Sequence, residues 1–295
     1  MDVVATYNLI RWILLAVAAA LLRGATPVFM RAGAKRSDPS FAAALFSTAL
    51  LGMSLVPVLL DGEWGAFWTV SNPSLIVLLV CGLLTAFLYL CLFTALTGAG
   101  ASRVFPLVNL YEVLLVVMAY FLFDGRLGVG RICCIMLVIL GTVLMQSRAA
   151  RSASPRWLLY SFLALASIVC ISLLNRAFLS GVVSSSIVLP FRCAVACILL
   201  WVFTLARGKQ KTARSMGLGS WITILLSALS IGLALICTTL GAALGEWSWL
   251  SPIQCLGIVS MLLFARIFLK EKLPGSAVFG LLLVVLGTFA IQMGW

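Results

Sequence analysis

The chain contains an internal duplication, and this feature constrains its fold more than any other. Identical residues recur 146 positions apart in the later part of each half: Pro106 and Pro252, Leu127 and Leu273, Gly141 and Gly287, Gln146 and Gln292. Near the start of each half the displacement is 145 positions: Arg11 and Arg156, Trp12 and Trp157, Arg31 and Arg176. One insertion reconciles the two displacements. The chain is therefore predicted to build one structural unit twice.

Composition places both copies in a membrane. Hydrophobic residues make up 63% of the 295 residues and charged residues 9%, with a mean hydropathy of +1.20, whereas soluble domains carry about 25% charge. A helix needs about 20 apolar residues to cross a bilayer. Ten segments qualify: 10–31, 41–60, 75–97, 104–123, 129–146, 157–179, 186–205, 221–244, 251–269 and 276–292. The predicted fold is an all-α integral membrane protein with ten transmembrane helices.

The net charge of +12 does not indicate a nucleic-acid partner, because the basic residues lie in short clusters between apolar segments, next to a lipid bilayer. Thirteen of them follow segments 1, 3, 5, 7 and 9: Arg31, Lys35, Arg36, Arg103, Arg148, Arg151, Arg156, Arg207, Lys209, Lys211, Arg214, Lys270 and Lys272. Four lie on the other side: Arg11, Arg126, Arg131 and Arg176. The positive-inside rule makes the richer side cytoplasmic. Both termini are then extracytoplasmic, and a bacterial inner membrane is the expected location.

Each copy contains five predicted crossings, and an odd number inverts the second copy relative to the first. We expect a first five-helix repeat over 1–147, a basic linker over 148–156 and a second, inverted repeat over 157–295. Inverted repeats are typical of secondary transporters, whose substrate site lies near the midplane where the repeats meet.

Several classes of protein are disfavoured. The chain has nine cysteines, almost all in apolar segments, no CxxC pair and no histidine, which excludes a Cys/His zinc site and predicts no metal. No GxSxG, HExxH or GxxxxGK[ST] motif is present, so neither an enzyme, a cofactor nor an ATP-driven pump is predicted.

Three charged residues within the segments are the main candidates for function, because a charge at bilayer depth is expensive unless it is paired or wet. Glu112, the one buried acid, is the candidate for a substrate contact or a proton-coupling group; the alternative is a structural pair with Arg23. Arg23, near Gly24 and Pro27, is predicted to line a cavity and to suit a carboxylate or phosphate. Arg192 follows Pro190 and is equally compatible with snorkelling.

Further polar residues complete the candidate set. Arg266 is expected to snorkel to the headgroups. Tyr111, Asn109 and Gln254 lie at helix depth and are candidates for substrate binding, as are Asn175 and Ser251. Each is equally compatible with hydrogen bonding between helices.

The chain resembles the drug/metabolite transporter superfamily, specifically its ten-helix EamA-type proteins, over essentially its whole length. The resemblance is carried by FLFDGRLGVGRICCIMLVILGTVLM and IFLKEKLPGSAVFGLLLVVLGTFAI, which are similar to the family's LGE-R/K-L…G pattern. Glu271 lies at the family's glutamate position, and Gly125 replaces it in the first half. Glu112 lies before a usual proline position, which Val113 occupies here, as Ile258 does in the second half. Relatives of the aromatic amino-acid exporter type have termini on the cytoplasmic side.

The resemblance implies a secondary carrier of small metabolites, acting as a monomer or homodimer. With Glu112 for an amine and Arg23 for a carboxylate, the expected substrate is an amino acid or amino-acid derivative. A phosphorylated or nucleotide-type anion would instead use Arg23 and Arg192, with a proton on Glu112. The superfamily also includes carriers of S-adenosylmethionine and lipid-linked sugar flippases, and the resemblance leaves both functions open.

Overall fold

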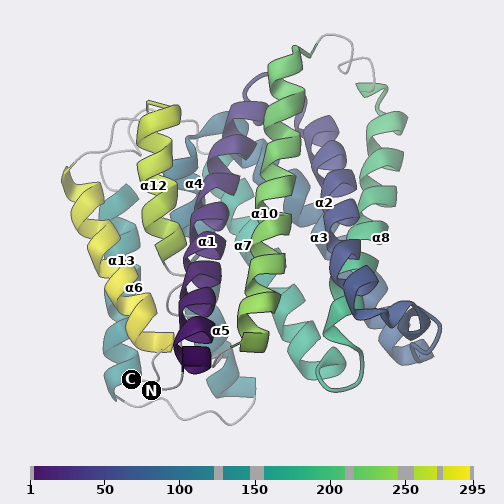
Figure 1. The fold of residues 1–295 in the computed structure, drawn as a ribbon. Coiled ribbons are helices and arrows are strands. Elements are labelled where there is room, and N and C mark those ends of the chain that lie inside the picture. The colour runs from purple at the N-terminus through teal and green to yellow at the C-terminus, as the bar shows by residue number, and fades with distance from the viewer. Residues whose placement is uncertain are drawn as a thin grey trace. The chain divides into compact units, whose positions relative to one another are not determined.

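The computed structural model describes residues 3–122, 129–146, 156–209, 216–244, 256–270 and 275–292. Within these ranges the secondary structure is helical and no strand forms, which confirms the predicted all-α class. The helices shown in Figure 1 are α1 (Val3–Ala34), α2 (Pro39–Asp61), η1 (Glu63–Phe67), α3 (Asn72–Gly98), α4 (Ala101–Val108), α5 (Tyr111–Leu122), α6 (Val129–Gln146), α7 (Arg156–Leu174), η2 (Asn175–Leu179), α8 (Ser185–Ala206), α10 (Leu218–Leu244), α12 (Leu256–Phe268) and α13 (Gly275–Gln292).

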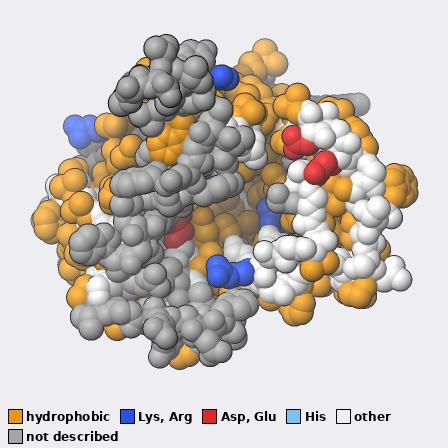
Figure 2. Space-filling view, turned by 60° about the horizontal axis from the view of Figure 1, so that its bottom comes forward, with side chains coloured by type: hydrophobic (Ala, Val, Ile, Leu, Met, Phe, Trp, Pro, Cys, Tyr) orange, Lys and Arg blue, Asp and Glu red, His pale blue; other side chains and the backbone are white. Residues whose placement is uncertain are grey.

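The helices have the lengths and surfaces of a multi-pass membrane protein. Among the described residues, six spans are long and apolar enough to cross a bilayer: Ile10–Ala34, Pro39–Asp61, Asn72–Gly98, Arg156–Leu179, Ser186–Ala206 and Leu218–Gly241. Shorter apolar helices cover Ile132–Met145, Leu256–Phe268 and Val278–Ala290. Large apolar side chains point outward, and hydrophobic atoms cover much of the described surface in Figure 2. Such extended apolar surface is unusual for a soluble monomer and suits contact with lipid.

The elements recur with the period of the sequence. Both ends of α13 lie 146 residues after those of α6, and both ends of α10 lie 146 residues after those of α3. The start of α8 follows that of α2 by the same displacement. The duplication therefore acts on secondary structure as well as on individual residues.

Packing divides the chain into two compact units, and each contains helices from both sequence halves. Unit 1 comprises Met1–Val28, Gly100–Ala153 and Leu233–Trp295. Unit 2 comprises Phe29–Ala99 and Ser154–Gly232. The repeats predicted over 1–147 and 157–295 stay a prediction about the sequence, whereas compact packing divides the chain at other positions.

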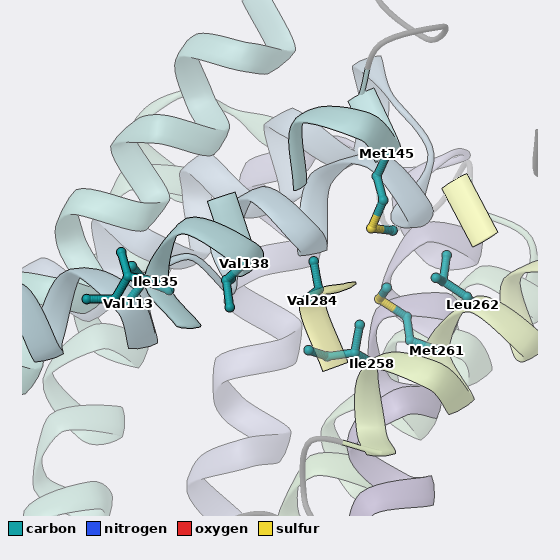
Figure 3. Close-up of a cluster of buried hydrophobic side chains, with 8 residues drawn as sticks. All are labelled: Val113, Ile135, Val138, Met145, Ile258, Met261, Leu262 and Val284. Atoms are coloured by element: carbon teal, nitrogen blue, oxygen red, sulfur yellow. The ribbon is translucent and has the colours of Figure 1, made fainter. Parts of the chain in front are cut away.

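In unit 1 the core lies where α5, α6, α12 and α13 meet. Its buried cluster consists of Val113, Ile135, Val138, Met145, Ile258, Met261, Leu262 and Val284 (Figure 3). Glycines bring α6 and α13 together: a Cβ on Gly141 would lie 2.5 Å from the carbonyl oxygen of Gly280. A Cβ on Gly287 would lie 2.9 Å from the carbonyl oxygen of Cys134. A side chain at either glycine would collide with the backbone of the facing helix, so small residues are needed at this crossing, as in close helix pairs in membranes.

In unit 2, α2, α3, α7 and α8 pack together around aromatic residues. The Phe41 ring meets those of Trp201 and Trp221 edge to face, with centroids 5.8 and 5.4 Å apart. Between α2 and α8, Trp201 Nε1 donates to Thr48 Oγ1 at 2.8 Å. Trp201 lies well inside a predicted segment, and this bond satisfies its indole N–H, which a tryptophan away from water requires.

Asp38 caps the start of α2 in the same unit. Its carboxylate accepts from the N–H and hydroxyl of Ser40 and lies 3.2 Å from Lys209 Nζ. Burial alone would raise the pKa of Asp38, but the bonds from Ser40 and Lys209 outweigh it and hold that pKa below its ordinary value of 3.8.

Two predicted segments differ in detail from the structure. The continuous helix predicted over 104–123 is wrong, because α4 ends at Val108 and α5 begins at Tyr111. Segment 157–179 ends in a π-helical turn, η2, where the N–H of Ser180 donates to the carbonyl of Asn175 at 2.9 Å. Of segment 251–269, the described part begins at Leu256, so Gln254 and Ser251 lie outside the described residues.

Candidate functional site

Arg23 lies where α1 crosses α12 in unit 1. A Cβ on Gly24 would lie 1.8 Å from Ser260 Oγ and 2.7 Å from both the Gly257 carbonyl oxygen and the Met261 nitrogen. The Ser260 hydroxyl is within donating distance of the carbonyls of Ala20, at 3.2 Å, and Gly257, at 3.0 Å. The two backbones are thus in contact, and the Arg23 side chain starts at the edge of that contact.

The polar groups of Arg23 are only partly satisfied. Its side chain is half-buried, and its Nε is a buried donor with no hydrogen-bond partner in the described part of the chain. Pro27 lies inside α1 four residues later and has no N–H, so the Arg23 carbonyl loses the donor that an α-helix would supply. Arg23 therefore offers an unused guanidinium donor and, on its own backbone, a carbonyl released from the helix ladder.

Glu112 lies in the first turn of α5, and not in the middle of the continuous helix predicted over 104–123. At the junction with α4, Leu110 N–H donates to Leu107 at 3.2 Å and Glu112 N–H to Asn109 at 3.3 Å. Both bonds span three residues, which is 3₁₀ geometry. Pro106 removes one helical donor just before, and asparagine favours helix ends over helix interiors. The sequence therefore interrupts this helix although Val113 replaces the usual proline.

The interruption gives Glu112 a favourable place for a negative charge. The first turn of a helix presents N–H groups and the positive end of the helix dipole. The Tyr111 hydroxyl donates to Glu112 Oε1 at 3.3 Å. Arg23 and Glu112, both of which the structure describes, form no salt bridge with each other. The predicted alternative of a structural Arg23–Glu112 pair is thus not formed here.

The unit 1 core connects the surroundings of these two charges. Val113, the neighbour of Glu112, belongs to the buried cluster, as do Ile258 and Met261 of α12 (Figure 3). Residues of α12 also contact α1 beside Arg23. In unit 1, α12 therefore contacts α1 beside Arg23 and also belongs to the core that includes Val113, the neighbour of Glu112.

Arg192 belongs to unit 2 and has different surroundings. It lies in α8 just after the buried Pro190, within electrostatic range of Cys81 and Tyr89 on α3. Its Nε is a buried donor without a hydrogen-bond partner among the described residues. The sequence of unit 2 contains three acids, Asp38, Asp61 and Glu63, and each lies at a helix end. The Cys81 thiol and the Tyr89 hydroxyl are therefore neighbours of the Arg192 charge inside the unit.

The remaining polar candidates have structural partners or exposed positions. Asn175 opens the π-helical turn, and its Oδ1 lies 3.8 Å from the Cys81 thiol, which donates to it. Arg266 is exposed in the last turn of α12, where a positive charge suits both the headgroups and the helix dipole. Sequence reasoning did not find the α1–α12 crossing, because the small residues Ala20, Gly24 and Gly257 form no signal that identifies their partner helix.

Comparison with known proteins agrees with this architecture. The model of the EamA-like transporter family matches residues 10–147. A solved crystal structure has the same fold, with a TM-score of 0.63 over 94% of this chain and 95% of that chain, at 18% sequence identity. No curated protein matches the sequence. Residues 10–147 are thus similar to the EamA-like transporter family, and the family match and the apolar spans together indicate a multi-pass integral membrane protein.

Proposed function

We propose that this EamA-like membrane transporter carries a small polar metabolite, an amino acid or amino-acid derivative, by alternating access without ATP. The proposal includes ten transmembrane helices in two inverted five-helix repeats. It also includes the orientation given by the basic residues, with both termini extracytoplasmic in a bacterial inner membrane.

The α6–α13 crossing supports the inverted repeat. Gly141 of α6 contacts Gly280 of α13, and Gly287 of α13 contacts Cys134 of α6. A displacement of 146 residues converts the first contact into the second with the helices exchanged. Reciprocal contacts of this kind are what a two-fold axis produces. Two copies related by an axis in the membrane plane would meet in this way.

The substrate proposal rests on the Nε of Arg23, a buried donor with no hydrogen-bond partner among the residues that the structure describes. A guanidinium held at bilayer depth is costly without a counter-charge, and its planar donors fit a carboxylate in two parallel bonds. The Arg23 carbonyl released by Pro27 and the carboxylate of Glu112 are acceptors for an ammonium group. Unit 1 thus supplies groups for both ends of a zwitterion, with Tyr111, Asn109 and Gln254 as proposed polar contacts.

A second candidate, a carrier of phosphorylated or nucleotide-type anions, is favoured by Arg192. Its buried Nε also lacks a partner in the described residues, and the acids of its unit lie at helix ends. A phosphorylated or nucleotide-type anion would pair with Arg192 in unit 2, and Glu112 would then carry the coupling proton. The two candidates differ in what Glu112 does.

A thermal-shift screen with purified protein tests both. Amino acids, sugar phosphates and nucleotides are added in turn, because a ligand that binds the native state raises Tm in proportion to the logarithm of its concentration over Kd. We expect an amino acid to stabilise the native protein but not the Arg23→Gln or Glu112→Gln variants. Arg266→Gln, the same substitution at an exposed arginine, should respond like the native protein.

The opposite results are equally specific. In one such outcome, stabilisation is seen only with phosphorylated compounds, is lost in Arg192→Gln and is retained in Glu112→Gln. That set of results would show that the substrate is an anion and not an amino acid. In that case pH-driven accumulation in proteoliposomes should disappear in Glu112→Gln. A response that survives Arg23→Gln contradicts the proposed site.

A further inference from the structure

Helices α2 and α8 are antiparallel neighbours in unit 2, and a polar contact joins them at one end. In Figure 1 the two helices run side by side. Asp38, the N-cap of α2, forms a salt bridge of 3.2 Å with Lys209, three residues after α8 ends. The start of one helix is thus tied to the end of the other.

A second polar contact joins the opposite end of the pair. Ser184 is the N-cap of α8, and its hydroxyl donates to the Glu63 carboxylate, two residues after α2 ends. Each helix therefore begins at a residue that reaches the segment following its neighbour.

These two contacts are the same contact built twice. The 146-residue displacement converts Asp38 into Ser184 and Glu63 into Lys209, and it exchanges the helices. The turn that places Glu63 and Lys209 is repeated as well. Gly62 has φ of 68° and Gly208 has φ of 65°, the left-handed conformation with which helices commonly end. Position and backbone geometry are kept, whereas the chemical groups differ.

We infer that Asp38–Lys209 and Ser184–Glu63 are the two ends of a clamp that holds α2 and α8 together as one rigid pair throughout the transport cycle. Both contacts are present in one structure, whereas two alternating gates would have one contact open while the other is closed. Between the ends, Trp201 of α8 donates to Thr48 of α2. The pair is thus connected at three levels along its length.

The clamp makes Asp38, Lys209, Ser184 and Glu63 positioning residues and not ligands of the substrate. Because α8 carries Arg192, holding α2 and α8 together fixes the position of that arginine relative to α2. This inference rests on the proposed transport function, and its experiments separate a failure of the clamp from a failure of the function.

The first experiment locks each end covalently. The pairs Asp38→Cys/Lys209→Cys and Glu63→Cys/Ser184→Cys are joined with a short bifunctional methanethiosulfonate that dithiothreitol removes. Uptake of a radiolabelled amino-acid mixture into proteoliposomes is measured before and after reduction. The single-cysteine variants, treated with the same reagent, control for the native thiols.

A rigid pair keeps at least half of its uptake rate with either end locked. If either cross-link lowers uptake tenfold or more and reduction restores it, that end must open during transport and the inference is wrong. If the native protein takes up none of the mixture, the proposed amino-acid function fails, and the second experiment still tests whether the two contacts are equivalent and stabilise the pair.

The second experiment converts one end into a copy of the other. Ser184→Asp places a carboxylate against Glu63 and should lower Tm, because like charges repel. Adding Glu63→Lys recreates the Asp38–Lys209 pair and should restore Tm. Asp61→Lys, at an exposed position two residues earlier, is the matched control and should not restore it. Equal rescue by Lys at both positions, or none at either, contradicts the equivalence of the two contacts.

Discussion

Replacing Gly24 by alanine should separate α1 from α12 and disturb Arg23. The new Cβ would lie 1.8 Å from Ser260 Oγ and 2.7 Å from two backbone atoms of α12. The serine can rotate away, but the backbone atoms can move only if the helices move apart. Overpacking typically costs about 1–3 kcal/mol. Losing the Ser260–Ala20 hydrogen bond adds about 0.6 kcal/mol, the average for interhelical bonds in membranes.

The combined loss, about 2–4 kcal/mol, should be measured by thermal unfolding in detergent. The matched control is Gly52→Ala in α2, where a Cβ meets nothing within 4 Å. Alanine is favoured over glycine in a helix by about 0.5–1 kcal/mol, so Gly52→Ala should be neutral or stabilising. Adding Ser260→Ala to Gly24→Ala should recover only part of the loss, because the backbone contacts remain. Equal stability of Gly24→Ala and Gly52→Ala would refute the close crossing.

Three further predictions concern stability. Gly141→Ala and Gly287→Ala should lower Tm by similar amounts, because their Cβ atoms would meet carbonyl oxygens at 2.5 and 2.9 Å. The control Gly275→Ala, which has open space around its Cβ, should leave Tm unchanged. A lower Tm in only one of the first two variants would argue against equivalent contacts. Asp38→Asn should remove a contribution of less than about 1 kcal/mol at neutral pH. Because the pKa of Asp38 is lowered in the folded state, this contribution to stability is complete above the ordinary pKa of 3.8 and is lost as the pH falls below that value. A Tm difference between the native protein and Asp38→Asn that changed between pH 5 and 8 would contradict this assignment. Trp201→Phe should keep the edge-to-face contact with Phe41 but lower Tm by removing the bond to Thr48; unchanged unfolding would show that this bond contributes nothing.

Most helix positions could be predicted from the sequence, because each span needs a long apolar segment whatever its neighbours are. The duplication also predicted which elements correspond, and α6 and α13 have matching bounds. The interruption between α4 and α5 was missed because apolar residues flank Asn109 on both sides, in a segment long enough to cross a bilayer. Only hydrogen bonding distinguishes a 3₁₀ junction from a continuous helix at such a position.

Tertiary partners were beyond sequence reasoning for a related reason. A small residue such as Gly24 indicates that something approaches closely, but not which helix does so. The same is true of Asp38, which any loop lysine on the basic side could have paired. The compact units, which combine helices from both sequence halves, likewise depend on packing between segments far apart in the chain.

The duplication separates residues that hold the fold from residues suited to bind a substrate. Several contacts between helices occur in equivalent pairs, such as those of Gly141 and Gly287. The charges at bilayer depth occur once: the positions equivalent to Arg23, Glu112 and Arg192 are Ile168, Ile258 and Phe46. A paired framework can take up two states related by exchange of its halves at similar energy, as alternating access requires. Arg23 and Glu112 have no charged equivalent in the other half, so the amino-acid site proposed for them would be asymmetric within that framework. Such a site would hold an amino acid, whose two ends carry opposite charge, in a single orientation in both states.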